Sequence, residues 1–150
     1  MELAVKGVVL CLVLLSLYCS DVQGAQCNMT GVWFNSEGSV LSLHRDGPHL
    51  GGSLHSSVKL SQEGGGDEKT GRLIGTVGKG KEPTFSMSIS WKGGETVTAC
   101  IGQCFVKPHC SYLHSTWLIR SHSTEEEDWK ATRIVEDYFY PKNCDENELA

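Results

Sequence analysis

The 150-residue sequence predicts an all-β fold, an eight-stranded antiparallel up-and-down β-barrel. In the segment 84–91, TFSMSISW, apolar residues alternate with polar ones, which is typical of a strand buried on one face. Turn sequences also recur at short intervals, and no segment has a clear helical period. Many short strands joined by short connections favour a closed meander, because closure removes the free sheet edges.

Glycine-rich or polar turns separate most of the predicted strands. In order, these turns are Glu37-Gly38, Asp46-Gly47-Pro48, the polar loop 62–69, Gly78 to Gly80 and Gly93-Gly94. The strands are predicted near 30–35, 38–45, 50–58, 71–78, 83–92, 95–106, 111–121 and 130–140. Thr, Val and Ile are frequent in the sixth and seventh of these segments, and such residues fit a pleated, half-buried surface.

The first 24 residues have the features of a secretory signal peptide. Lys6 precedes an apolar run from Val8 to Tyr18, and Val22 and Gly24 suit cleavage after Gly24. The run is too short and wrongly flanked for a membrane span, and a buried core helix is the weaker alternative. We therefore expect a secreted, extracellular protein that is free of the membrane once the signal is removed. Its segments are a signal peptide at 1–24, a barrel domain at 25–141 and an acidic tail at 142–150.

The charge balance argues against a nucleic-acid partner. The whole chain has a formal net charge of −5, and residues 1–24 contribute −1 through Glu2, Asp21 and Lys6, which leaves −4. A mildly acidic protein lacks the basic surface that binds phosphates. No metal site is predicted either, because the histidines are scattered singly without ligand spacing. They are His44, His49, His55, His109, His114 and His122.

The cysteine count predicts disulfides with one thiol left over. Cys11 and Cys19 lie in the signal peptide, and five cysteines remain: Cys27, Cys100, Cys104, Cys110 and Cys144. Disulfides are expected in an oxidising compartment, and an odd count leaves one cysteine unpaired. Asn28-Met29-Thr30 is an acceptor sequence for N-glycosylation, which suits a secreted protein.

Five motifs in one order make the sequence resemble the avidin family over about 27–139. They are Cys27…Thr30-Gly31-Val32-Trp33…Asn35, Pro83-Thr84-Phe85…Trp91-Lys92, Gly102-Gln103-Cys104-Phe105, Thr116-Trp117-Leu118-Ile119-Arg120-Ser121 and Asp128-Trp129-Lys130-Ala131-Thr132-Arg133. The resemblance implies a homotetrameric barrel that binds biotin as a ligand, without catalysis and without a cofactor. It also implies that Trp129 reaches into the pocket of a neighbouring subunit, whereas folding back on its own barrel is the alternative.

The resemblance implies a set of polar contacts to the ureido group of biotin. Asn35 and Ser39 align with two donors to the ureido oxygen. Ser56 and Asp137 are expected to accept hydrogen bonds from the two ureido N–H groups. The family's third donor is a tyrosine, and here the aligned residue is Leu54.

Leu54 is the most serious departure from the family pattern. A shift of one residue would bring His55 into the pocket, but strand alternation keeps Leu54 and Ser56 on the same face. Losing one of three donors is expected to cost on the order of 1–3 kcal/mol of binding free energy.

The resemblance also assigns the apolar walls and the ends of the pocket. Trp91, Trp117 and the neighbour's Trp129 form the aromatic box, although without the resemblance Trp91 and Trp117 are simply buried aromatics. Trp33 belongs mainly to the core at the closed end. The remaining assignments are Ile119 in the ligand site, Thr98 toward the ligand sulfur, Ser61 and Thr96 as candidates for its carboxylate, and Cys100, in place of a phenylalanine, in the lining.

At the ligand's carboxylate end the sequence departs from the family again. Gly93 and Gly94 replace a phenylalanine and a serine, and the loop from Lys59 to Lys69 differs in length. The family's residues in that loop are therefore not carried over, and Lys59 is expected to be solvated.

Two disulfides are predicted. Cys27 and Cys104 match the pair bridged in the family. Cys110 precedes the seventh predicted strand and Cys144 follows the eighth, so antiparallel pairing brings them to one side and predicts a second bridge. Cys100 is then the free thiol.

The outward faces of two strands are more apolar than a monomer needs, which predicts burial against other subunits. The outward residues are Val97, Ala99 and Ile101 on one strand and Ile134, Tyr138 and Tyr140 on the other. A lipocalin-like carrier of a small apolar ligand is the rival interpretation, but it does not explain the convergent polar residues. An enzyme is less favoured, because no nucleophile or second acid is placed to work with Asp137.

Overall fold

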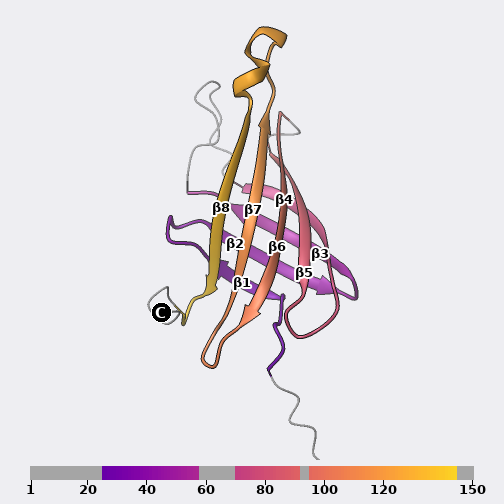
Figure 1. Ribbon diagram of the computed structural model, residues 1–150, viewed down its shortest axis with the longest axis vertical. Helices are drawn as coiled ribbons and strands as arrows, with labels where there is room; N and C mark the ends of the chain where they lie inside the picture. The colour runs from indigo at the N-terminus through magenta and orange to yellow at the C-terminus, as the bar shows by residue number, and fades with distance from the viewer. Residues whose placement is uncertain (1–24, 58–69, 92–94, 145–150) are drawn as a thin grey trace, which may run out of the picture.

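The computed structural model describes residues 25–57, 70–91 and 95–144. These residues form eight antiparallel strands that close into a barrel in sequence order, which confirms the predicted fold (Figure 1). The predicted signal peptide at 1–24, Lys59, Ser61, Gly93, Gly94 and residues 145–150 lie outside the described residues. The strands are β1 (Gly31–Phe34), β2 (Val40–Asp46), β3 (His49–His55), β4 (Thr70–Val77), β5 (Thr84–Trp91), β6 (Thr96–Val106), β7 (Ser111–Ser121) and β8 (Thr132–Pro141).

Side chains alternate between the barrel interior and its outer surface. In β5 every second residue is buried and the residues between are exposed, which confirms the predicted period of two. The interior is filled by large apolar side chains, among them Leu41, Leu73, Ile89, Leu113 and Phe139. Burial of this apolar surface is the main favourable contribution to folding.

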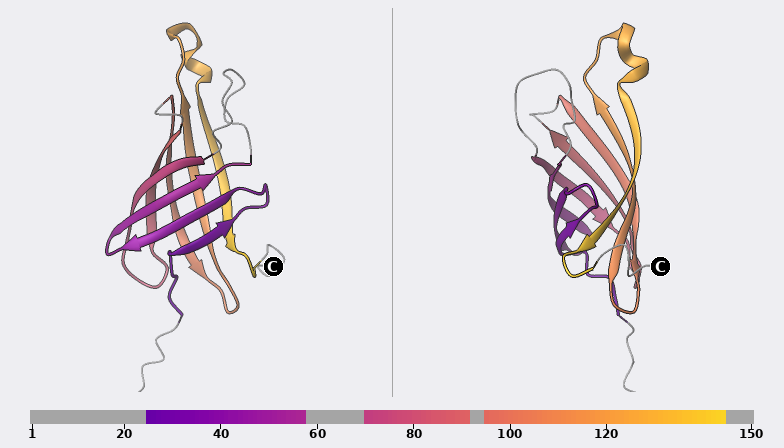
Figure 2. Two further views of the ribbon diagram at one scale, coloured as in Figure 1. Left: turned by 180° about the vertical axis from the view of Figure 1, so that it is seen from behind. Right: turned by 90° about the vertical axis from the view of Figure 1, so that its left-hand side faces the viewer.

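The strands differ greatly in length. β6 and β7 have 11 residues each, whereas β1 has 4. β1 closes the barrel against β8 through the pairs Trp33↔Pro141 and Phe34↔Tyr140. The β7–β8 hairpin therefore projects beyond the other strands (Figure 2). We call the end with this projection the open end, and the end with the β6–β7 turn the closed end.

The closed end is fixed by core packing and by both predicted disulfides. Trp33 is buried there and its indole Nε1 donates to the Met29 carbonyl oxygen at 3.3 Å. Cys27 is bridged to Cys104, with Cα atoms 6.3 Å apart. Cys110 is bridged to Cys144, with Cα atoms 6.0 Å apart. Each bridge closes a long segment and is expected to stabilise the fold by about 2–5 kcal/mol.

A 3-10 helix at the tip of the hairpin was not predicted. This helix, η2 (Glu125–Lys130), carries Trp129 and lies between β7 and β8. Its turns are closed by Glu127 N–H donating to the Thr124 carbonyl oxygen and by Ala131 N–H donating to that of Asp128. The acidic residues fall in its first turn, where the helix dipole favours negative charge. Such a short helix leaves no periodicity in the sequence.

Tyr140 lies on the outward row of β8, as predicted, but it is not exposed there. Tyr140 is buried, and its ring lies against that of Tyr112 with centroids 6.1 Å apart. Next to it, β8 pairs with β1 at Phe34, so the end of β8 is covered. The outward residues higher on the barrel are exposed as predicted, with Ile101 and Ile134 66% and 71% accessible. Within the described residues no helix has the length and apolar character needed to cross a membrane.

Candidate functional site

A cavity of about 480 Å³ occupies the open end of the barrel. Strand alternation points residues from β3, β5, β6, β7 and β8 into it, and the β1–β2 turn adds a polar edge. The volume suits a small organic molecule. Its lining consists of Asn35, Ser36, Glu37, Ser39, Leu54, Ser56, Trp91, Thr98, Trp117, Ile119, Ser121, Ala131, Arg133, Val135, Glu136, Asp137, Tyr138 and Phe139.

Two tryptophans form apolar walls and are held in place by hydroxyl groups. Trp91 Nε1 donates to Thr98 Oγ1 at 2.9 Å, and Trp117 Nε1 donates to Ser115 Oγ at 2.8 Å. Ser115 in turn donates to the Asp137 carbonyl oxygen at 3.0 Å. Because both indole N–H groups are satisfied, the rings can be buried at little polar cost and kept in one orientation.

Ser115 is a residue that the sequence interpretation missed. It is buried and holds Trp117 through the hydrogen bond described above. Its position two residues before Trp117 on an alternating strand was the available signal, since both must point inward.

A polar cluster joins β1 to β8 across the cavity. Asn35 Nδ2 donates to Asp137 Oδ2 at 2.7 Å, and Asn35 Oδ1 accepts from the Ser39 backbone N–H at 2.7 Å. The second carboxylate oxygen, Asp137 Oδ1, accepts from the Tyr138 backbone N–H at 2.8 Å. Ser39 Oγ accepts from the Ser57 backbone N–H at 3.1 Å and lies 3.2 Å from Ser57 Oγ. Three predicted site residues therefore meet at one place.

The Asp137 carboxyl group has a perturbed pKa. Burial raises its pKa above the ordinary value, because desolvation disfavours the charged form. The hydrogen bonds from Asn35 and from the Tyr138 N–H oppose that shift, and the nearby charge of Glu37 adds to it. The cavity thus holds a partly desolvated acceptor with room for a further donor.

The structure places Leu54 and Ser56 on the cavity wall together, as predicted from alternation. His55 points to the outer surface, where its Nδ1 lies 2.9 Å from Thr70 Oγ1. A one-residue shift that would bring His55 into the site is therefore not seen, and the aliphatic side chain of Leu54 lines the cavity instead.

Other predicted residues are only partly brought together. Thr98 and Ile119 line the cavity, but Thr96 does not: it is buried at the start of β6, where it pairs with Ser121. Trp129 is 83% accessible on η2 and does not line the cavity of its own barrel. In this structure Trp129 does not fold back on its own barrel.

Cys100 was expected in the lining and lies behind it instead. Its thiol is free and buried. Burial raises the pKa of the Cys100 thiol to about 12, with a hydrogen bond to Ser115 opposing the shift and the charge of Asp137 adding to it. Cys100 lies two residues beyond Thr98 on β6, toward the closed end, and pairs with Met87 and Trp117. Among the described residues no group of three or more potential metal ligands is found.

Comparison of the sequence with known proteins identifies a family. The sequence profile of the Avidin family matches residues 23–142. Avidin from Gallus gallus is 32% identical over 133 residues, with 83% of this chain and 85% of that protein covered. Avidin-related protein 4/5 from Gallus gallus is 30% identical over 128 residues, with the same coverage.

Solved structures agree with the sequence comparison. The crystal structure of Xenavidin matches with a TM-score of 0.67 and 28% identity, covering 77% of this chain and 98% of that one. The structure of a biotin-binding protein from chicken matches with a TM-score of 0.68 and 27% identity, covering 77% and 96%. The fold and the sequence lead to the same result, and this chain belongs to the avidin family.

Proposed function

We propose that this chain is a secreted, non-catalytic protein that binds biotin in the cavity at the open end of the barrel. One observation carries the proposal: the same cavity contains two hydroxyl-anchored indole walls and the Asn35, Ser39 and Asp137 cluster. The apolar bicycle of biotin requires the indole walls, and its cyclic urea requires the polar cluster. The chain's place in the avidin family supports the choice of ligand.

The ureido oxygen of biotin meets two donors in this proposal. An amide nitrogen has two N–H groups, so Asn35 can use one for Asp137 and the other for the ligand. Ser39 Oγ can accept from both the backbone N–H and the hydroxyl of Ser57, and in that arrangement its own O–H donates to the ligand. Leu54 cannot donate, so the third hydrogen bond known in the family has no side chain here.

In this proposal each ureido N–H group of biotin donates to an acceptor, and the biotin sulfur accepts from a hydroxyl donor. A carboxylate offers about four lone-pair sites, so Asp137 can accept one ligand N–H beside its bonds to Asn35 and Tyr138. Ser56 accepts from the other ligand N–H. Thr98 Oγ1 accepts from Trp91 and keeps its O–H for the thioether sulfur. No group in this scheme attacks the ligand, and binding requires no cofactor.

A neighbouring subunit completes the site in this proposal. Trp129 lies almost fully exposed on η2, and a large exposed aromatic side chain is a common interface anchor. Apolar side chains on the outer face, including Ile101, Leu118 and Ile134, provide a surface for association. We therefore propose a homotetramer in which each Trp129 covers the ligand of an adjoining barrel.

The proposal places the protein outside cells, with 1–24 as its signal peptide, 25–141 as the barrel and 142–150 as a tail. Asn28 is exposed and precedes β1, so it is accessible for glycosylation. Sequestration of biotin from microbes and storage of the vitamin are both consistent with such a protein.

Thermal unfolding of purified protein freed of bound vitamin, with and without biotin, tests the proposal. A ligand that binds only the native state stabilises it by about 4 kcal/mol at a thousandfold excess over Kd, so the midpoint should rise strongly. An unchanged midpoint at millimolar biotin contradicts the proposal. An increase produced by a fatty acid or retinoid, but not by biotin, would favour a lipocalin-like carrier.

A further inference from the structure

Arg133 is a base on the inward row of β8. It lines the cavity with Val135 and Asp137, which follow it at every second position, and it pairs with Ile119 of β7. Among the described residues that line the cavity it is the sole Lys, Arg or His. Its guanidinium group makes no hydrogen bond or ion pair with the described residues. The cavity mouth therefore has an uncommitted cation.

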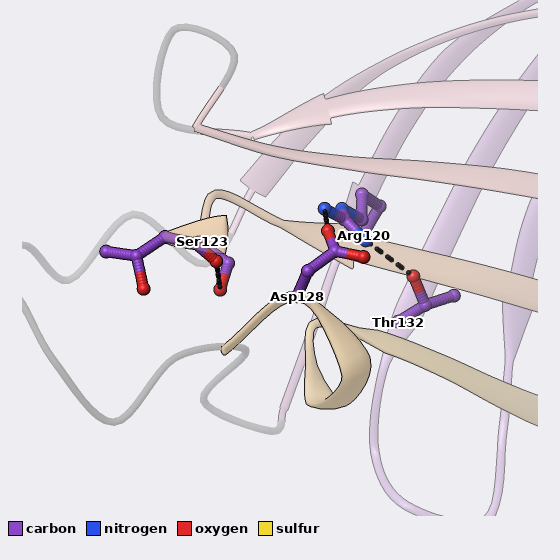
Figure 3. Close-up of polar contacts among 5 residues, drawn as sticks. Arg120, Ser123, Asp128 and Thr132 are labelled. Atoms are coloured by element: carbon purple, nitrogen blue, oxygen red, sulfur yellow. Dashed lines mark hydrogen bonds and ion pairs between the residues drawn. The ribbon is translucent and has the colours of Figure 1, made fainter. Parts of the chain in front are cut away.

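Two other described bases near this end, Arg120 and Lys130, are paired with acidic side chains. Arg120 forms an ion pair with Asp128 and donates to Thr132 Oγ1 at 3.2 Å (Figure 3). Lys130 pairs with Glu127 within η2. Asp128 and Glu127, two of the acidic side chains of η2, are therefore paired with bases other than Arg133.

Along β8 the cavity lining carries one cation, Arg133, and two carboxylates, Glu136 and Asp137, farther along the strand. Arg133 and Asp137 are four residues apart, which is about 13 Å along a strand. Glu37 contributes further negative charge beside Asp137. A ligand with hydrogen-bond donors at one end and an anionic group on a chain at the other fits this polarity in one direction. The reverse orientation would bring the anion against two carboxylates.

We propose that Arg133 is a specificity-determining residue, whose guanidinium pairs with the terminal carboxylate of the bound ligand and selects the free acid over neutral derivatives. This inference depends on the proposed function and names a side chain for the part of the ligand that the polar cluster does not contact. The planar guanidinium matches a carboxylate through two parallel N–H···O bonds. Thr96, which was expected in that role, lies outside the cavity lining.

The test compares biotin with biotinamide, which replaces the carboxylate with a neutral amide, in binding competition at low salt. Arg133 is exposed, so its contribution is modest and is reduced by added salt. We expect Arg133→Gln to weaken biotin binding about threefold to tenfold and to change biotinamide binding less than about twofold. Arg133→Lys should retain part of the preference for the acid.

Arg72→Gln is the matched control, because Arg72 is exposed on the outward row of β4 and does not line the cavity. It removes the same charge and should leave both affinities unchanged. Equal weakening of biotin and biotinamide by Arg133→Gln, or no weakening of either, overturns the assignment of Arg133 while the proposed function survives. If neither compound binds the unaltered protein, the proposed function fails together with the inference.

Discussion

Trp117 and Trp129 stand on the same β7–β8 hairpin and have opposite surroundings. Trp117 is 5% accessible, is held by Ser115 and lies 6.0 Å from the Phe139 ring. Trp129 is 83% accessible, on a helix that projects from the barrel. The chain itself buries Trp117, whereas the role proposed for Trp129 requires a partner subunit. The barrel body and the hairpin tip should therefore respond differently to substitution.

Trp117→Ala is expected to have the largest effect, because it damages both the fold and the proposed site. Truncating a buried tryptophan should lower the free energy of unfolding by about 3–5 kcal/mol. Binding of biotin should fall as well, since one wall of the cavity is lost. Denaturant unfolding without ligand measures the first effect, and titration with biotin measures the second. A stability loss below about 1 kcal/mol would contradict the core role of this side chain.

Trp129→Ala should separate binding from folding. An exposed side chain contributes little to its own barrel, so ligand-free stability at low protein concentration should change by less than about 0.5 kcal/mol. Biotin affinity should fall by about 2–4 kcal/mol, or about thirtyfold to a thousandfold, if a neighbouring subunit buries this ring over the ligand.

Mixed tetramers provide the control for that prediction. When Trp129→Ala subunits are assembled with subunits that carry Trp117→Ala, some sites should regain an intact pair of tryptophans and recover tight binding. Loss of affinity that follows each subunit's own genotype would show that Trp129 acts within its own barrel.

Leu54→Tyr tests whether the barrel body lacks one donor. A hydroxyl at this position should strengthen biotin binding by about 1–3 kcal/mol, or about fivefold to 150-fold, by completing the hydrogen bonds to the ureido oxygen. Leu54→Phe is the matched control, because it adds the ring without the hydroxyl and should give no comparable gain. Equal effects of the two variants would mean that ring packing, not the missing donor, governs this position.

The Asp137 carboxyl should make ligand binding depend on pH. Its pKa is raised above the ordinary value by burial, so protonation begins at a higher pH than for an exposed aspartate. Protonation removes an acceptor for a ligand N–H, and biotin affinity should fall as pH decreases through that raised pKa. The Asp137→Asn variant keeps an acceptor oxygen and should show a flatter pH profile between pH 7 and acid.

The contribution of Asp137 to the stability of the ligand-free protein should depend on pH in the opposite direction to its contribution to biotin affinity. A carboxyl whose pKa is higher in the folded than in the unfolded state favours folding in its protonated form, so its ionised form carries a penalty at neutral pH. Asp137→Asn should therefore raise the unfolding midpoint slightly at pH 7, and the difference should disappear as pH falls through the folded pKa. A lower midpoint at pH 7 would contradict the dominance of burial over the hydrogen bond from Asn35.

The body of the barrel was more predictable from sequence than its ends. Alternation is a local property of a strand, so it identified Phe85 to Trp91 as one inward row and kept Leu54 and Ser56 together. The second disulfide was predicted for the same reason, because antiparallel neighbours bring Cys110 and Cys144 to one side.

The misses lie where the environment depends on distant packing. Tyr140 has an outward position by alternation but is covered beside Tyr112, and nothing in its own strand indicates that cover. Cys100 is on an inward position of β6, yet it lies farther toward the closed end than the residues that line the cavity. Arg133 precedes Val135 and Asp137 on the same inward row of the predicted strand, but the resemblance named no residue there, so it was not assigned to the site.

The seam between β1 and β8 is closed by two residue pairs, and directly above them Asn35 donates to Asp137. The backbone pairing of β1 with β8 is thus extended by a side-chain hydrogen bond between the same groups that are proposed to bind biotin. A bound ligand would therefore add contacts across the β1–β8 pair, which has the fewest paired residues in the barrel. We expect amide hydrogens of Phe34 and Tyr140 to exchange with solvent much more slowly in the saturated protein, so that occupancy and resistance to opening rise together.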